Sequence, residues 1–207
     1  KTNVGMYDVG EDGLPVDLKT GKLPEFIDGL PFPKIDDTDP KAGTKIMYNK
    51  NYYTYAVGNL FVPLQGKWVG RKTGVEREIV MDYWVYPMDG YPAARNEANP
   101  EKLEMHSIIR ALAPYDIKGT NILLWRYGDA KQDSTFAFVP AIRRVRRMSP
   151  ANRSDAFLGS DFCVDDAWGY GGKVNAFEWK VIKKVDQLVP FYPAPPVELR
   201  LNDAGEW

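Results

Sequence analysis

The sequence predicts a mainly β fold built as an antiparallel meander, and three observations support this. Segments rich in β-branched and aromatic residues recur through the middle of the chain, with turn-forming residues between them. Their spacing leaves room for hairpin turns but not for the crossover helices of parallel βαβ units. In addition, 16 prolines and 18 glycines are spread over the 207 residues, which disfavours long helices.

The two ends of the chain differ from its middle. Residues 1–45 are rich in acidic residues and prolines and predict an extended N-terminal arm laid over a domain. Residues 46–189 carry the strand pattern and predict the sheet domain, and the prolines of 190–207 predict an extended C-terminal tail. Between arm and sheet, Lys41–Tyr55 suits one short helix, although its closely spaced tyrosines also suit a strand.

The first predicted strand, Glu78–Tyr86, has two apolar faces. One face carries Ile79, Met81, Tyr83 and Val85, and the other carries Val80, Trp84 and Tyr86, interrupted by Asp82. Alternating side chains point to opposite sides of a sheet, so this strand belongs to a sheet with something packed on each face.

Further strands are predicted along the rest of the chain. They are Met105–Ala113, Asn121–Tyr127, Thr135–Val139, Ile142–Met148 and Asn175–Val185. The prolines at 140 and 150 favour a strand over a helix for the fourth of these. A loop with a one-turn helix is predicted for Ser149–Phe162, and a glycine-rich loop for Asp165–Gly172.

Composition excludes several classes of function. The 27 Lys and Arg residues nearly balance the 28 Asp and Glu residues, which argues against a nucleic-acid partner because such binding rests on a basic surface. No window approaches the roughly 18 consecutive apolar residues of a membrane helix, so no transmembrane segment is predicted. Cys163 and His106 are the only Cys and His, too few for a structural zinc site.

No catalytic residue, metal ligand or cofactor is predicted. No serine or cysteine stands in a nucleophile-elbow context for which His106 could act as the general base. Asp161, Asp165 and Asp166 do not match the spacing of a calcium loop, and we interpret them as partners of nearby arginines or as caps of a short helix.

Four arginines in five residues, at 143, 144, 146 and 147, are the most unusual local feature. Each guanidinium calls for an anion. One interpretation is a docking site for a carboxylate, phosphate or sulfate head group, which makes Arg143 and Arg147 candidate ligand-binding residues. The other is that the arginines pair with the acids that follow them, namely Asp155, Asp161, Asp165 and Asp166. Both stay open.

Aromatic side chains on the predicted strands are the second candidate site. They are Trp84, Tyr86, Trp125, Phe136, Phe138, Phe177 and Trp179. Such rings either fill a core or line a concave sheet that accepts an apolar ligand, and both interpretations remain.

One motif resembles a known family. The run PAIRRVRR at residues 140–147, followed by FLGSDF at residues 157–162, is similar to the bacterial domain-of-unknown-function family 1329. That family is related to the LolA/LolB-like outer-membrane lipoprotein-sorting proteins. Weaker matches are GLPFP at 29–33, Leu112-Ala113-Pro114 with Gly119-Thr120, and Phe177-Glu178-Trp179. The resemblance covers about residues 29 to 185.

The resemblance implies an open, strongly curved antiparallel sheet, an incomplete barrel, with short helices on its concave side around a hydrophobic cavity. It also implies export to the periplasm of a Gram-negative cell. Typical members are longer at both ends and have a signal peptide. The incomplete sheet of this chain is therefore expected to leave an edge open, and either a partner covers that edge or the chain is truncated.

Together these features predict a non-enzymatic periplasmic or outer-membrane-associated carrier or chaperone. Its expected ligand is a lipid or another hydrophobic small molecule, and its expected protein partner is an envelope transporter or another subunit. The alternative is a structural or assembly subunit without a small ligand. An enzyme acting on a hydrophobic substrate is least favoured.

Overall fold

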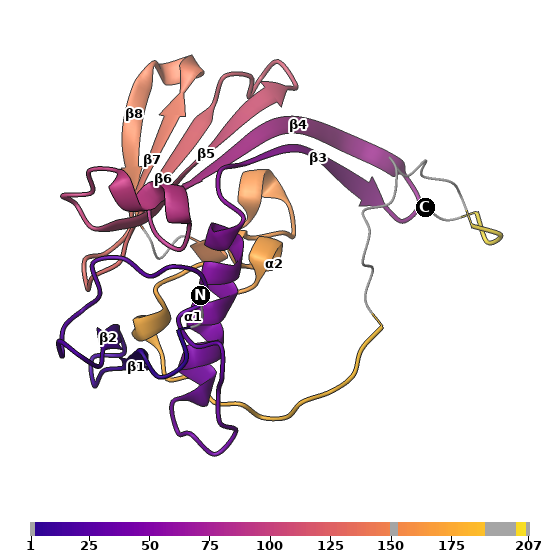
Figure 1. The fold of residues 1–207 in the computed structure, drawn as a ribbon. Helices are drawn as coiled ribbons and strands as arrows, with labels where there is room; N and C mark the ends of the chain where they lie inside the picture. Colours follow the sequence, from indigo (N-terminus) through magenta and orange to yellow (C-terminus); the bar gives the residue numbers. More distant parts are fainter. Residues whose placement is uncertain (1–2, 150–152, 189–201, 206–207) are drawn as a thin grey trace.

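A computed structural model describes residues 3–149, 153–188 and 202–205 of the chain. Six strands form one antiparallel sheet that arches over a long helix (Figure 1). The strands are β3 (Leu60–Gly70), β4 (Gly74–Pro87), β5 (Leu103–Ala113), β6 (Asn121–Tyr127), β7 (Ser134–Val139) and β8 (Arg144–Met148). They pair in sequence order, with β3 and β8 at the two edges. This confirms the predicted mainly β fold and its open, curved antiparallel sheet.

The other elements are short except for α1. A hairpin of β1 (Tyr7–Val9) and β2 (Pro15–Asp17) forms a separate two-stranded sheet. The helices are α1 (Ala42–Ala56), η1 (Pro92–Asn96), η2 (Pro140–Ile142), η4 (Phe157–Gly159), α2 (Val164–Trp168) and η5 (Val174–Ala176). Within the described ranges, no helix has both the length and the apolar character needed to cross a bilayer.

Helix α1 resolves the ambiguity of the segment after the arm. Tyr48, Tyr52 and Tyr55 are each at most 3 % exposed. Their spacing of four and three residues places them on one side of a helix, which turns a run of tyrosines into a single buried stripe. That stripe packs with Val85 and Met105 of the sheet, so α1 fills the side of the sheet that it faces.

The N-terminal arm contributes to the same core. Ile27 and Phe32 are 1 % and 4 % exposed and belong to the cluster formed by α1 and the sheet. The backbone of Phe32 is held at both ends by Asn49 of α1, which accepts from its N–H at 3.0 Å and donates to its carbonyl at 2.6 Å. Of the predicted tail 190–207, all but residues 202–205 lies outside the described residues.

Two segments differ from the sequence prediction. No strand was predicted at β3, yet Leu60–Gly70 is one. Its Pro63 is tolerated because β3 is an edge strand, and among the described residues no further strand pairs with its outer edge. The predicted loop Asp165–Gly172 also overlaps α2.

The prediction of a strand at Asn175–Val185 is wrong. Its first residues lie in η5, and no strand forms in the rest. Trp179 explains the difference, because its indole N–H donates to the Val174 carbonyl at 2.7 Å and its ring lies 4.9 Å from that of Tyr170. These local contacts dock the segment on α1, away from the edges of the sheet, although its sequence alternates.

Gly43 marks where this segment crosses α1 closely. A Cβ at Gly43 would lie 2.3 Å from the carbonyl oxygen of Trp179, which is main chain and cannot swing away. We expect Gly43→Ala to cost about 1–3 kcal/mol of folding free energy, because overpacking must displace the backbone of the 177–180 segment. Urea unfolding measures the cost. Tyr53→Ala, which truncates a 72 % exposed side chain on the same helix, serves as the control. An unchanged unfolding midpoint for the Gly43 variant would contradict the close approach.

Candidate functional site: an apolar outer sheet face and a buried polar centre

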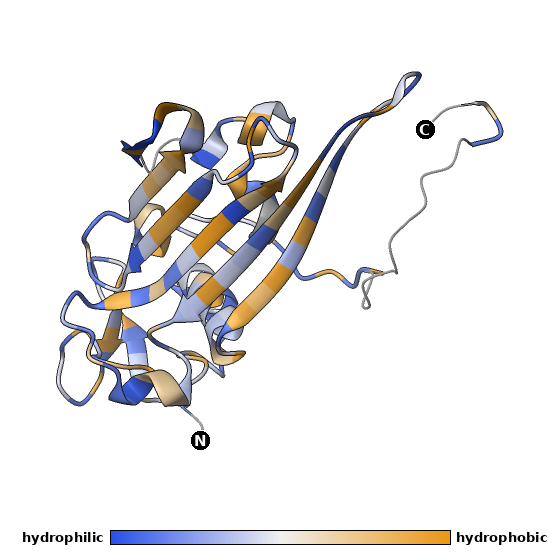
Figure 2. Cartoon of the chain, turned by 90° about the horizontal axis from the view of Figure 1, so that it is seen from above, coloured by the Kyte–Doolittle hydropathy of each residue, from blue (hydrophilic) through white to orange (hydrophobic). Residues whose placement is uncertain are grey.

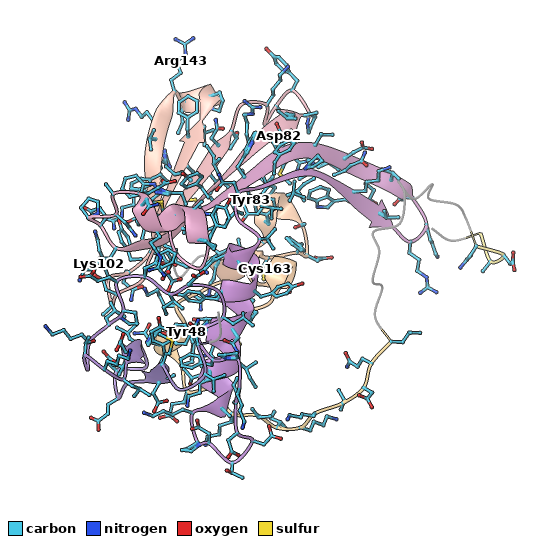
Figure 3. The ribbon with its side chains drawn as sticks, in the orientation of Figure 1. Tyr48, Asp82, Tyr83, Lys102, Arg143 and Cys163 are labelled. Atoms are coloured by element: carbon cyan, nitrogen blue, oxygen red, sulfur yellow. The ribbon has the colours of Figure 1, made fainter. Side chains whose placement is uncertain are left out.

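The register of the strands assigns every side chain of the sheet to one of two faces. Residues directly opposite each other on neighbouring strands share a face. The inner face, toward α1, carries Tyr83 and Val85, and the outer face carries Asp82 and Trp84. Figure 3 labels Asp82 and Tyr83, which are consecutive in β4 and lie on its two sides. Figure 2 shows the sheet from the side of the outer face.

Two rows of register partners cross the outer face. The first row is Phe61, Trp84, Ile108, Leu123, Phe136 and Arg147, one residue from each strand of the sheet. The second row is Tyr86, His106, Trp125 and Ser134, from β4 to β7. Phe138 lies on the same face, opposite Val145. Five of the seven predicted aromatic residues therefore lie together on this face.

Several aromatic rings of the outer face contact one another, and they are half-buried or exposed. Ring centroids lie 5.2 Å apart for Phe61 and Trp84, and 5.8 Å apart for His106 and Trp125. Trp125 continues to Phe136 at 6.0 Å. Phe61 is nevertheless 55 % exposed. The rings thus form two groups that are only partly exposed, and Trp125 also packs against the buried cluster of Met88, Leu103 and Tyr127.

The prediction that these rings line the concave side of the sheet is wrong. The sheet arches toward α1, and the tyrosines of α1 occupy that inner side (Figure 1). Trp84 and Trp125 point the other way because strand alternation assigns them the opposite face from Val85 and Leu124, which pack in the core.

Phe177 and Trp179 do not join the other predicted aromatic residues. They form a separate group with Tyr170, with centroids 5.6 Å and 4.9 Å from that ring. Trp179 packs against the core around α1, whereas Phe177 is 56 % exposed. The structure therefore places these two rings away from the outer face.

The arginine run is divided by its own secondary structure. Arg147 lies opposite Phe136 on the outer face, whereas Arg144 and Arg146 lie opposite Val139 and Ala137 on the other side. Arg143 occupies a left-handed turn position with φ of 50° before β8, and Figure 3 shows it pointing away from the molecule. The two predicted ligand-binding arginines are thus not neighbours in space.

The predicted pairing of the arginines with the following acids does not form. Asp165 pairs with Arg153 at 3.2 Å, and Asp166 accepts from the Cys163 N–H at 2.8 Å, at the start of α2. Across the residues that the structure describes, no ion pair joins the arginines at 143, 144, 146 and 147 to an acid. All four are exposed.

Sequence reasoning missed a buried polar centre beneath the inner face. A β-bulge leaves Glu104 without a partner on β6, and the next residue, Met105, resumes the pairing. Bulges re-aim side chains in this way. Glu104 is 7 % exposed and accepts from the Tyr55 hydroxyl of α1 at 3.0 Å.

Two cations accompany Glu104. Arg126, 7 % exposed, donates to Asp133 at 3.2 Å and to the Gly171 carbonyl. Lys173 donates to the carbonyls of Tyr127 and Asp129. The centre therefore ties α1, the sheet and the 170–175 segment together. Only the tertiary fold assembles it, because its members are far apart in the sequence and none stands in a motif.

Burial controls the protonation of this centre. Desolvation raises the pKa of Glu104 to about 7, although the charges of Arg126 and Lys173 act in the opposite direction. Burial likewise raises the pKa of Asp89 to about 6 and lowers the pKa of Lys173. Glu104 therefore changes its charge near neutral pH.

The hollow at this centre is small. Its volume is about 10 Å³, and its lining includes Tyr48, Asn51, Glu104, Arg126, Lys173 and Asn175. That volume is about what one water molecule needs, so this hollow suits a water and not a lipid chain. Among the described residues, no three His, Cys, Asp or Glu side chains are grouped to hold a metal ion.

Comparison with known proteins identifies relatives. A family model described as protein of unknown function (DUF1329) matches residues 3–205. The crystal structure of a DUF1329 family protein from Desulfovibrio piger superposes with a TM-score of 0.50 at 22 % identity, covering 68 % of this chain and 54 % of that chain. That of a putative outer membrane lipoprotein-sorting protein domain from Vibrio parahaemolyticus gives 0.48 at 16 %, covering 68 % and 52 %. This chain thus spans about half the length of either structure. No curated protein matches it.

Proposed function

This chain belongs to the DUF1329 family, and we propose that it is a non-enzymatic carrier of the bacterial cell envelope that binds a lipid-like hydrophobic molecule on its outer sheet face. The observation that carries the proposal is the pair of largely apolar rows across that face, which include Trp84 and Trp125. The resemblance of the central arginine motif to an envelope family supports the periplasmic or outer-membrane location and a transporter as the protein partner.

The physical argument rests on exposed apolar area. Soluble monomers rarely expose a large contiguous apolar patch without a use for it. A ligand that buries about 300 Å² of such apolar surface contributes roughly 7 kcal/mol of binding free energy before the entropy costs of binding. The outer, second apolar face of β4 lacks the helix that covers its inner face, and a bound ligand would pack against it.

The surroundings of the imidazole support the non-enzymatic part of the proposal. His106 is the only histidine, and it lies between Tyr86 and Trp125 in the second row. Burial lowers the pKa of His106, which favours its neutral form, and the ring packs with its aromatic neighbours.

Polar substitutions on the outer face test the proposal. We expect wild-type protein to bind the neutral probe N-phenyl-1-naphthylamine with an increase in probe fluorescence. Trp84→Ser and Trp125→Ser should each weaken binding about tenfold, because each removes a large part of the contact area. Tyr115→Ser, which changes a 94 % exposed aromatic residue in the turn after β5, should leave binding unchanged. Absence of probe binding by the folded wild type, confirmed by native mass spectrometry with added lipid, would reject the carrier.

An assembly subunit is the second candidate, favoured by the edges of β3 and β8, which pair with no further strand among the described residues. In that case the outer face and the edges dock on another polypeptide. Sedimentation velocity distinguishes the carrier from the assembly subunit. A protein that stays monomeric at high concentration and binds the probe supports the carrier. Self-association that abolishes probe binding supports the subunit.

A further inference from the structure

The first row of the outer face has a polarity along its length. Its members from β3 to β7 are Phe61, Trp84, Ile108, Leu123 and Phe136, all apolar, and the last, on β8, is Arg147. The row crosses all six strands, so its five interstrand steps span about 24 Å. The guanidinium of Arg110 lies 5.1 Å from the centroid of the Trp84 ring, but it is paired with Asp82. An apolar row of this length that ends in a cation with no acidic partner among the described residues has the form of a binding site for an amphiphile.

Arg147 is free to receive an anion. Its guanidinium donates to the Ser134 hydroxyl at 3.3 Å, beside Trp125, and no acidic partner for it is found within residues 3–149, 153–188 and 202–205. Other charged side chains of this face, in contrast, have partners. Arg110 pairs with Asp82 at 3.0 Å, and Glu97 accepts from the Tyr86 hydroxyl.

The surroundings of Arg147 reinforce its charge. Arg144 and Arg146 lie on the same strand with their side chains on the opposite side, and Arg143 precedes them in the turn. All are exposed, so the β8 end of the row is strongly basic. A guanidinium binds a carboxylate or phosphate through two parallel hydrogen bonds, which makes an anionic head group the best match.

We propose that the guest is a single-chain amphiphile with an anionic head, its chain lying along the first row and its head bound by Arg147. This inference rests on the proposed function and specifies the ligand class and its orientation. Carboxylate and phosphate heads share the required chemistry.

Four amphiphiles with twelve-carbon chains test the proposal below their critical micelle concentrations: dodecanoate, dodecyl phosphate, dodecyl maltoside and dodecyltrimethylammonium. Displacement of N-phenyl-1-naphthylamine measures each affinity, and comparison of the first two identifies the preferred anion. We expect wild type to bind at least one anion about tenfold more tightly than the neutral maltoside, and the cation most weakly.

Matched arginine variants locate the head group. Arg147→Gln should remove the preference for the anion, a loss of about tenfold, while binding of dodecyl maltoside stays unchanged. Arg144→Gln removes the same charge three residues away on the other side of β8, and it should keep most of the preference. Far-ultraviolet circular dichroism confirms that both variants fold.

Three outcomes would overturn the inference. Equal affinities of wild type for all four amphiphiles leave the carrier in place but remove the role of Arg147. Equal losses of anion preference in the Arg147 and Arg144 variants would show that the preference comes from the overall positive charge of β8 and not from Arg147 itself. If none of the four displaces the probe and the probe itself does not bind, the proposed function fails as well.

Discussion

Wild-type protein should lose stability as the pH rises through neutrality, and Glu104→Gln should abolish most of that loss. The pKa of Glu104 is raised from 4.5 to about 7 by burial, so the folded state keeps a proton that the unfolded state releases. A state that binds more protons is favoured at low pH, and its advantage falls as pH rises between the two pKa values. Between pH 5 and pH 8 the loss from Glu104 is about 2–3 kcal/mol. Gln cannot ionise, so the variant should show a flatter profile.

Urea unfolding at several pH values measures this difference. Asp89, whose pKa is also raised, contributes a similar slope at lower pH, and His106, whose pKa is lowered, contributes the opposite slope. Because both remain in the variant, subtracting the two profiles isolates Glu104. Parallel profiles would show that Glu104 is already ionised at neutral pH in the folded state, stabilised by Arg126 and Lys173.

Arg126→Met should destabilise the fold by about 3–5 kcal/mol, which is the cost of removing one partner from a buried ion pair. Its guanidinium is the direct ion-pair partner of Asp133, which is 6 % exposed, and it binds the carbonyl of Gly171. Without Arg126 both acceptors stay buried and lose a donor. Thermal unfolding should show a large decrease in midpoint.

A matched substitution and a double variant complete this test. Arg110→Met breaks the exposed pair with Asp82 and should cost at most about 1 kcal/mol. Adding Asp133→Asn to the Arg126 variant should recover part of the lost stability, since a neutral amide is less costly to bury than an unpaired carboxylate. Strictly additive losses would mean that Arg126 acts on Gly171 alone and not as the partner of Asp133.

The buried polar centre affects the outer face indirectly, because it holds α1 against the inner face of the sheet. Tyr55 donates to Glu104, while Tyr48 and Tyr52 of the same helix fill the inner side of the sheet. With that side occupied, the outer face is the remaining large apolar surface of β4 to β7. The polar centre thus stabilises the arrangement that makes the outer face available to a guest, without contacting it.

The sequence by itself determined five of the six strands of the main sheet, β4 to β8, and the alternation of their side chains. The bounds Asn121–Tyr127 follow from a run of β-formers closed by glycine, and the two apolar sides of β4 follow from a period of two. The same alternation already implied that Trp84 and Tyr86 share a face. These features are local, because they depend only on neighbours along the chain.

Only the tertiary structure decided which face is covered and which is open. Alternation states that Trp84 and Val85 point in opposite directions but not which of them meets α1. The division of the arginines across β8 depends on register, and the failure of the 175–185 strand depends on contacts of Trp179 near α1. The centre around Glu104 and Arg126 required a bulge and three distant segments to meet, and packing between distant segments leaves no local periodic signal in the sequence.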